Sequence, residues 1–113
     1  MIHGVGIDVV DIDRFKQSLE RTPSLNQKLF TEAERNKSIQ SLAARFAAKE
    51  ALIKALNAEN GILWHEAEVV NLEGGKPLFI FYGALADLVD GAKVHLSLSH
   101  DAGIATAIVM VER

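Results

Sequence analysis

The sequence predicts an α+β fold in which an antiparallel sheet packs against one long central helix. An apolar, β-branched segment opens the chain at residues 2–10, and an alanine-rich segment without glycine or proline covers residues 41–56. Four strand-like segments then fill most of the second half of the chain. Helices gathered before a run of strands are typical of this class.

The first strand, residues 2–10, contains one carboxylate, Asp8, among apolar residues that predict burial. A charge in such surroundings is costly unless a partner compensates it. Asp8 could cap the end of the strand or pair with a buried lysine. Alternatively, Gly4 and Gly6 share its side of the strand and leave the backbone uncovered, so a ligand or another chain could approach there.

Three helices are expected after this strand. The first covers the segment DIDRFKQSLER, residues 11–21, whose aspartates suit a helix start, and Pro23 ends it. The second is predicted to begin in FTEAE, where Thr31 and Glu34 have the spacing of a capping box. The third, residues 41–56, is apolar nearly all the way round, as in a buried helix.

Four charged side chains interrupt this long helix. Arg45 and Lys49 lie one turn apart, and Glu50 and Lys54 lie one turn apart on a neighbouring stripe. They could form a solvated edge with a helpful Glu–Lys pair. They could also bind a polyphosphate and its metal, because lysine and arginine neutralise phosphate while a carboxylate holds Mg²⁺.

The second half of the chain is predicted to form four strands, at residues 68–73, 76–83, 93–100 and 104–112. The segment EGGK indicates a hairpin turn between the first two, and GALADLVDGA indicates a short helix before the third.

The strand that contains HLSLSHD alternates between two kinds of side chain. Leu96 and Leu98 face one side, whereas Ser97 and Ser99 face the other, which is either simply solvated or lines a site. Ser99, His100 and Asp101 do not form a hydrolase triad, because consecutive strand residues point to opposite faces and no GxSxG motif is present.

Composition limits the remaining possibilities. The 113 residues predict a single domain over residues 1–113. The absence of cysteine excludes disulfides, thiolate catalysis and cysteine-ligated metals. A net charge of −3 argues against a nucleic-acid partner. No apolar run reaches the roughly 18 residues of a membrane span, and no signal peptide is seen, so we expect a cytoplasmic protein without a membrane partner.

Five motifs, GVGIDVVDIDRF, FTEAE, ARFAAKEALIKAL, GKP and LSLSHD, occur in this order along nearly the whole chain. Together they resemble the holo-acyl-carrier-protein synthases, the small bacterial type of 4′-phosphopantetheinyl transferase, and imply that fold. The resemblance implies an Mg²⁺-dependent enzyme of fatty acid biosynthesis that uses coenzyme A. In that reaction a serine hydroxyl of apo acyl carrier protein attacks the β-phosphate, phosphopantetheine is transferred and adenosine 3′,5′-bisphosphate leaves.

The resemblance also implies a role for each motif residue. Asp8 and Glu50 would be the metal ligands, and Lys54 would lie near the reacting phosphates. Glu50, directly or through a metal-bound water, is the favoured general base, and His100 is the second candidate. The residues that would hold coenzyme A are Arg45, Lys49, Lys54, Gly75, Lys76, Pro77, Ser99 and His100.

The sequence departs from the family in two places. Larger members carry an acidic residue two positions after the first aspartate, where this chain has Val10; this agrees with the small type, in which water would fill that metal position. The segment RNKSIQSLAA is also shorter than usual, which leaves Arg45 and Lys37 as candidates for binding the 3′-phosphate of coenzyme A.

The small family members are homotrimers with each active site between two chains, so the same assembly is implied here. The first helix resembles the surface that meets the acidic carrier protein. Its docking residues would be Arg14 and Arg21, with Lys16 and Lys28 adding positive charge.

Two other functions compete with the transferase. The chain could be a non-catalytic module that binds a nucleotide or a carrier protein, or a trimeric structural protein in which Asp8 forms buried salt bridges with lysine. The transferase is favoured because both predicted metal carboxylates and the helical lysines are present.

Overall fold

The computed structural model describes all 113 residues, and its elements follow the predicted order. They are β1 (Ile2–Asp11), α1 (Ile12–Arg21), α2 (Ser24–Leu29), α3 (Ile39–Leu56), a 3₁₀ turn (Trp64–Glu66), β2 (Ala67–Asn71), β3 (Pro77–Phe81), α4 (Gly83–Leu88), β4 (Lys93–Asp101) and β5 (Ile104–Glu112). None of these helices combines the length and the apolar character needed to cross a membrane.

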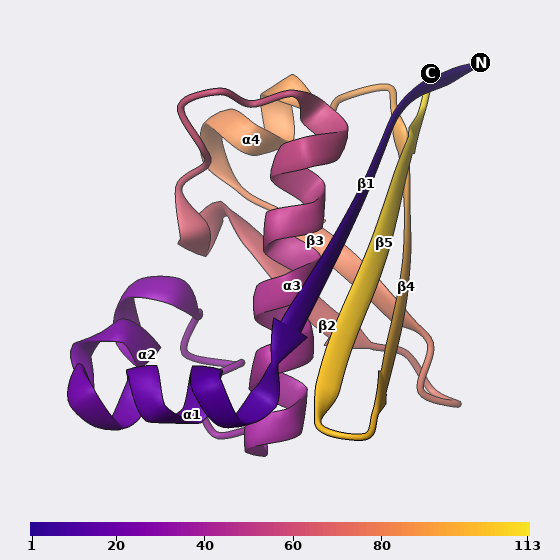
Figure 1. Ribbon diagram of the computed structural model, residues 1–113. Coiled ribbons are helices and arrows are strands. Elements are labelled where there is room, and N and C mark those ends of the chain that lie inside the picture. Colours follow the sequence, from indigo (N-terminus) through magenta and orange to yellow (C-terminus); the bar gives the residue numbers. More distant parts are fainter.

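The strands form two antiparallel sheets, where the sequence predicted one. β1, β5 and β4 make a three-stranded sheet in that order, and β2 and β3 pair separately. Helix α3 runs along the three-stranded sheet, with α1 and α2 gathered near its amino-terminal end (Figure 1). The predicted α+β class with a long central helix is therefore confirmed.

Helix α3 has a defined start and end, and its alanines are buried. Ser38 caps its start, since the Ser38 hydroxyl accepts a hydrogen bond from the Ser41 backbone N–H at 3.2 Å. Asn57 ends it in the left-handed conformation, with a φ of 53°. Six of its alanines are fully buried or nearly so: Ala43, Ala44, Ala47, Ala48, Ala51 and Ala55.

The predicted helix at FTEAE is wrong. Residues 32–36 form turns, and the second helix of the chain, α2, comes earlier. Glu34 does accept a hydrogen bond from the Thr31 backbone N–H at 3.0 Å, as in a capping box. However, the Thr31 hydroxyl donates to Glu68, and the Glu34 carboxylate points into the core, so no helix follows.

The first strand is buried on only one face. Gly6 and Val10 face α3, whereas Val5, Ile7 and Val9 on the other face are 51%, 58% and 62% exposed. The prediction of a buried strand is therefore half correct for a single chain. The exposed half remains an apolar surface that spans β1 and β5.

Gly4 and Gly6 admit the backbone of α3, not a ligand or another chain as the sequence suggested. A Cβ atom on Gly6 would lie 1.9 Å from the carbonyl oxygen of Ala51, and one on Gly4 would lie 1.9 Å from that of Ala55. The two glycines therefore allow the helix to approach β1 closely. This approach carries Asp8, on the same side of the strand, to the surface of α3.

We expect Gly6→Ala to lower the free energy of unfolding by about 1–3 kcal/mol, because two backbones must separate to admit the methyl group. Urea denaturation measures the effect. His3→Ala, an exposed change on the same strand, is the control and should leave the midpoint unchanged. Equal midpoints for the two variants would show that α3 does not pack on these glycines.

Candidate active site

Asp8 and Glu50, the two predicted metal ligands, lie in one pocket of about 290 Å³ between β1, α1 and α3. They are 42 positions apart in the sequence, and the packing of α3 on β1 brings them together. Apolar and polar side chains share the lining of this acidic pocket, which consists of Asp8, Val9, Val10, Asp11, Arg14, Phe15, Ser18, Phe46 and Glu50.

Lys54 lies directly beside the acidic pair. Its ammonium group donates to the backbone oxygen of Ile7 at 2.9 Å and forms an ion pair with Asp8 Oδ1 at 3.2 Å. Burial, followed by the negative charge of Asp8, raises the pKa of Glu50, and the charge of Lys54 partly opposes this shift. Asp8 and Glu50 therefore repel each other in this pocket, and the Lys54 ammonium group lies beside them.

This arrangement fits a magnesium ion with two protein ligands. Mg²⁺ prefers oxygen donors and commonly keeps several waters while one or two carboxylates and substrate phosphates hold it. A divalent cation would relieve the repulsion between Asp8 and Glu50. No group of three or more histidine, aspartate or glutamate residues with a metal-binding arrangement exists. The third carboxylate of the pocket, Asp11, caps α1 by accepting the Arg14 backbone N–H at 2.9 Å, so a site here would rely on Asp8 and Glu50.

Glu50→Gln should stabilise the metal-free protein at neutral pH. Because the pKa of Glu50 is raised in the folded chain, the free energy of unfolding falls as pH rises from its ordinary value of 4.5 through the raised value. The amide cannot ionise, so the variant should melt at a higher temperature than the original near pH 7, and this difference should shrink below about pH 4. Melting in a chelating buffer at both pH values tests this, with the exposed change Glu59→Gln as a neutral control.

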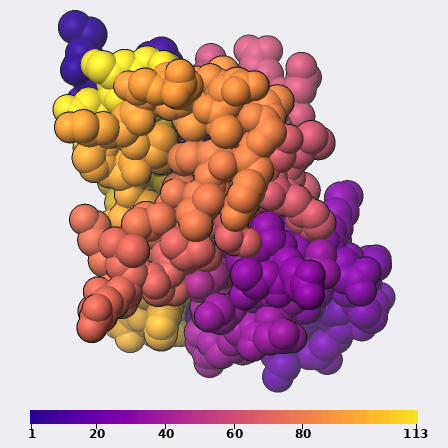
Figure 2. Space-filling view, turned by 180° about the vertical axis from the view of Figure 1, so that it is seen from behind, coloured from indigo at the N-terminus to yellow at the C-terminus, as the bar shows by residue number.

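A second pocket of about 290 Å³ gathers five of the eight residues predicted to hold coenzyme A. Arg45 comes from α3, Gly75 from the turn between β2 and β3, Pro77 from the start of β3, and Ser99 and His100 from β4. Figure 2 shows that turn (salmon) above the tip of the β4–β5 hairpin (yellow-orange), at the lower left of the molecule. We call this hollow the nucleotide pocket.

Sequence reasoning missed four polar residues of the nucleotide pocket. Ser38, Gln40 and Ser41 lie at the amino-terminal end of α3, and Asn71 ends β2. The spacing of Ser41 and Arg45, one helical turn apart, was the only available signal. Conversely, Lys37 and Lys76 are exposed and belong to neither pocket.

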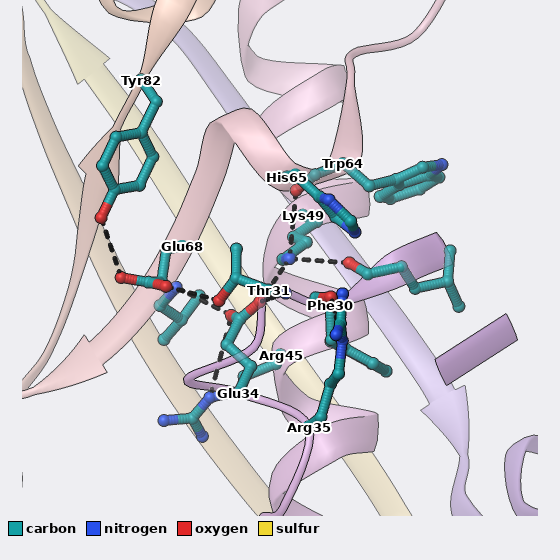
Figure 3. Close-up of polar contacts among 12 residues, drawn as sticks. Phe30, Thr31, Glu34, Arg35, Arg45, Lys49, Trp64, His65, Glu68 and Tyr82 are labelled. Atoms are coloured by element: carbon teal, nitrogen blue, oxygen red, sulfur yellow. Dashed lines mark hydrogen bonds and ion pairs between the residues drawn. The ribbon is translucent and has the colours of Figure 1, made fainter. Parts of the chain in front are cut away.

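The structure corrects the prediction for Lys49. This lysine is 0% exposed, and its ammonium group contacts Glu34 Oε1 at 2.7 Å and the backbone oxygens of Leu29 at 2.8 Å and Trp64 at 3.2 Å (Figure 3). Burial lowers the pKa of Lys49, while Glu34 opposes that shift. Since three protein oxygens occupy its donors within the core, Lys49 cannot reach a coenzyme A phosphate.

The four basic residues predicted for carrier-protein docking are all exposed, on α1 and α2. Arg14 also borders the acidic pocket. Figure 1 shows α1 and α2 projecting together from one end of α3. The positive surface therefore lies next to the predicted metal site.

The two pockets share no lining residue. His100, the second candidate for the general base, lies in the nucleotide pocket, whereas Glu50 lies in the acidic pocket. The predicted metal site and the predicted nucleotide site are therefore lined by different residues of one chain.

Comparison with known proteins agrees with the motifs. The chain matches the 4′-phosphopantetheinyl transferase superfamily over residues 4–109. It is 55% identical over 116 residues to a holo-[acyl-carrier-protein] synthase of Leifsonia xyli, covering 100% of this chain and 98% of the relative. It is 53% identical over 116 residues to that of Beutenbergia cavernae, covering 100% of both.

Two solved structures have the same fold. A holo-[acyl-carrier-protein] synthase from Neisseria meningitidis superimposes with a TM-score of 0.89 and 29% identity, covering 100% of both chains. A complex of the synthase with coenzyme A from Chronobacterium ammoniagenes has a TM-score of 0.85 and 30% identity, covering 96% of each chain.

Proposed function

The chain belongs to the 4′-phosphopantetheinyl transferase superfamily, in its holo-[acyl-carrier-protein] synthase group, and we propose that it loads an acyl carrier protein for fatty acid biosynthesis. It transfers 4′-phosphopantetheine from coenzyme A to a serine of the apo carrier protein, with Mg²⁺ as the metal. The observation that carries this proposal is the meeting of Asp8, Glu50 and Lys54 at the contact between β1 and α3. A cytoplasmic location stays a prediction.

The residues of the candidate active site would contribute to different parts of phosphoryl transfer. The serine oxygen of the carrier protein forms a bond to the β-phosphorus, and the bond from that phosphorus to the bridging oxygen breaks, so that adenosine 3′,5′-bisphosphate leaves. Charge increases on phosphoryl oxygens during such a step, so cations supply most of the stabilisation. Lys54 provides one cation beside the acidic pair.

Asp8 and Glu50 would hold the magnesium ion, which when bound supplies positive charge to the pyrophosphate. We favour Glu50 as general base for the serine hydroxyl, because it lies in the pocket with Asp8, beside Lys54, where the reacting phosphates are expected. His100 remains the second candidate. Arg45, Gly75, Pro77 and Ser99 would hold the nucleotide end.

We further propose that the protein is a homotrimer whose active sites lie between chains. The apolar face of β1 and β5 supports assembly, because Val9 is 62% exposed and Ile108 is 42% exposed on a single chain. The separation of the acidic and nucleotide pockets supports a shared site, since two chains could bring them together. Light scattering after gel filtration should give about three times the chain mass of 12.3 kDa.

Mass spectrometry tests the reaction directly. The protein is mixed with coenzyme A, Mg²⁺ and an apo acyl carrier protein, and the carrier should gain the mass of one phosphopantetheine group. No gain in mass would overturn the transferase. Binding of coenzyme A without transfer would indicate a non-catalytic module, and neither binding nor transfer would indicate a structural protein.

Charge reversal at Arg21 should weaken carrier docking. Arg21 is exposed at the end of α1 and does not line the acidic pocket, so its change leaves that pocket intact. We expect Arg21→Glu to raise the KM for the carrier protein about fivefold, roughly 1 kcal/mol, with the KM for coenzyme A unchanged. Arg21→Lys, which keeps the charge, is the control, and an unchanged carrier KM in Arg21→Glu would remove this end of α1 from the docking surface.

A further inference from the structure

Asn71, at the end of β2, forms hydrogen bonds through both the oxygen and the nitrogen of its side-chain amide. Its Oδ1 atom accepts a hydrogen bond from Arg45 Nη2 at 2.9 Å, and its Nδ2 atom donates to the backbone oxygen of Gly75 at 3.0 Å. A carboxamide with one accepting and one donating partner has a defined orientation. Asn71 therefore connects helix α3 to the turn between β2 and β3.

Arg45 depends on such partners for its orientation. Its side chain is 4% exposed, and its Nη1 atom donates to the hydroxyl of Ser41, one turn earlier on α3. Its Nε atom lies 3.9 Å from Glu34 Oε2 without a hydrogen bond. Ser41 and Asn71 thus hold the guanidinium group by hydrogen bonds at the edge of the nucleotide pocket.

The turn on the other side of Asn71 contains two glycines in the left-handed region. Gly74 and Gly75 have φ values of 88° and 91°, and nothing lies within 4 Å of where their Cβ atoms would be. The turn is closed by backbone hydrogen bonds between Leu72 and Lys76 and between Gly75 and Leu72, both of 2.8 Å. The bond from Asn71 is the side-chain contact that attaches Gly75 to α3 through Arg45.

We propose that Asn71 is a positioning residue for coenzyme A: it holds Arg45 and the backbone of Gly75 in one arrangement, so that the nucleotide pocket is formed before the ligand arrives. This inference rests on the proposed transferase function. A preformed site avoids ordering a long arginine side chain and a glycine turn during binding. Asn71 acts through these two neighbours, so its loss should weaken coenzyme A binding without slowing the chemical step.

Asn71→Ala tests the proposal with the full-length protein. The dissociation constant for coenzyme A from calorimetry, and its KM, should both rise about tenfold, as expected for the loss of one effective hydrogen bond. The kcat at saturating coenzyme A and the KM for the carrier protein should stay within about twofold. Leu72→Ala, an exposed change at the neighbouring position, is the control. It should alter neither the dissociation constant nor the KM for coenzyme A.

Two further measurements separate positioning from a merely structural role. Hydrogen exchange of the amides in residues 72–76 should become faster in Asn71→Ala without ligand. In a double-mutant cycle, Asn71→Ala should add little to the loss caused by Arg45→Lys, because the two residues act as one unit.

The outcomes are distinct. Unchanged coenzyme A binding in Asn71→Ala would overturn the positioning role and leave the transferase intact. This holds even if the kcat and the melting temperature of the variant fall. Additive losses in the cycle would also overturn it. If the original protein binds no coenzyme A at all, the proposed function and this inference fall together.

Discussion

Asp8→Asn is expected to lower kcat/KM for phosphopantetheine transfer by about a thousandfold, which corresponds to roughly 4 kcal/mol of transition-state stabilisation. The acidic pocket offers Asp8 and Glu50 to a metal, because its third carboxylate, Asp11, caps α1 by accepting the Arg14 backbone N–H at 2.9 Å. By the resemblance to the family, Val10 stands where larger members carry a further acidic residue. Removing one charge should therefore leave Glu50 unable to hold Mg²⁺ on the pyrophosphate alone.

The same variant should stay folded, which separates a functional role from a structural one. Asp8 and Glu50 repel each other, so the neutral amide removes an unfavourable interaction and leaves Lys54 bound to the backbone oxygen of Ile7. We expect a melting temperature no lower than that of the original protein. A second readout is the stabilisation by Mg²⁺ with coenzyme A, which Asp8→Asn should lose.

Asp87→Asn, an exposed change on α4, is the matched control and should keep both activity and the response to Mg²⁺. A near-normal rate for Asp8→Asn at saturating Mg²⁺ would contradict the metal assignment.

Lys49→Ala is expected to lower the free energy of unfolding by about 3–5 kcal/mol, because it leaves the buried Glu34 carboxylate without its hydrogen-bonded counter-ion, with only Arg45 Nε at 3.9 Å. Glu34 is 1% exposed, and its other oxygen accepts the Val69 backbone N–H at 2.9 Å. The change would also free the backbone oxygens of Leu29 and Trp64 that Lys49 now binds. Figure 3 shows these groups converging on the ammonium group from separate segments of the chain.

Lys54→Ala, five residues further along the same helix, provides the contrast. The Lys54 side chain is 54% exposed and pairs with Asp8, so its loss should change stability by less than about 1 kcal/mol. It should nevertheless lower the rate of transfer, because Lys54 lies beside the acidic pair. Urea denaturation and turnover of both variants give the comparison, and equal urea midpoints for the two would show that the buried pair does not hold the core together.

Much of the candidate site could be anticipated from spacing. Glu50 and Lys54 lie one turn apart on α3, and Asp8 is a lone carboxylate in an apolar strand. Because a charge in an apolar segment is costly unless a partner compensates it, these three side chains were candidates for a site. Arg45, Gly75, Pro77, Ser99 and His100 were expected together, and the structure places them in one pocket. Helix and strand periodicity decide which side chains of one element share a face. The grouping of Arg45, Gly75, Pro77, Ser99 and His100 across several elements came instead from the resemblance of the motifs to the family.

Other assignments depended on neighbours distant in sequence. Lys49 and Lys54 look alike along the helix, yet only Lys49 is covered by the segment that contains Glu34. The helix expected at FTEAE was wrong because the Lys49 ammonium draws the Glu34 carboxylate inward, a contact between residues 15 positions apart. Asn71 gave no signal, since its two hydrogen bonds exist only once β2 lies beside α3.

The sequence by itself determined the α+β class, the order of the elements and the long alanine-rich helix, because these follow from local propensity and periodicity. The pairing of Asp8 with Glu50 was implied only by the resemblance of the motifs to the family. Only the tertiary structure decided what Gly4 and Gly6 are for, which lysine is buried and which polar groups orient Arg45. Burial and close backbone approach are properties of packed surfaces. They are settled by which elements meet, and that information is absent from the spacing of residues along any one element.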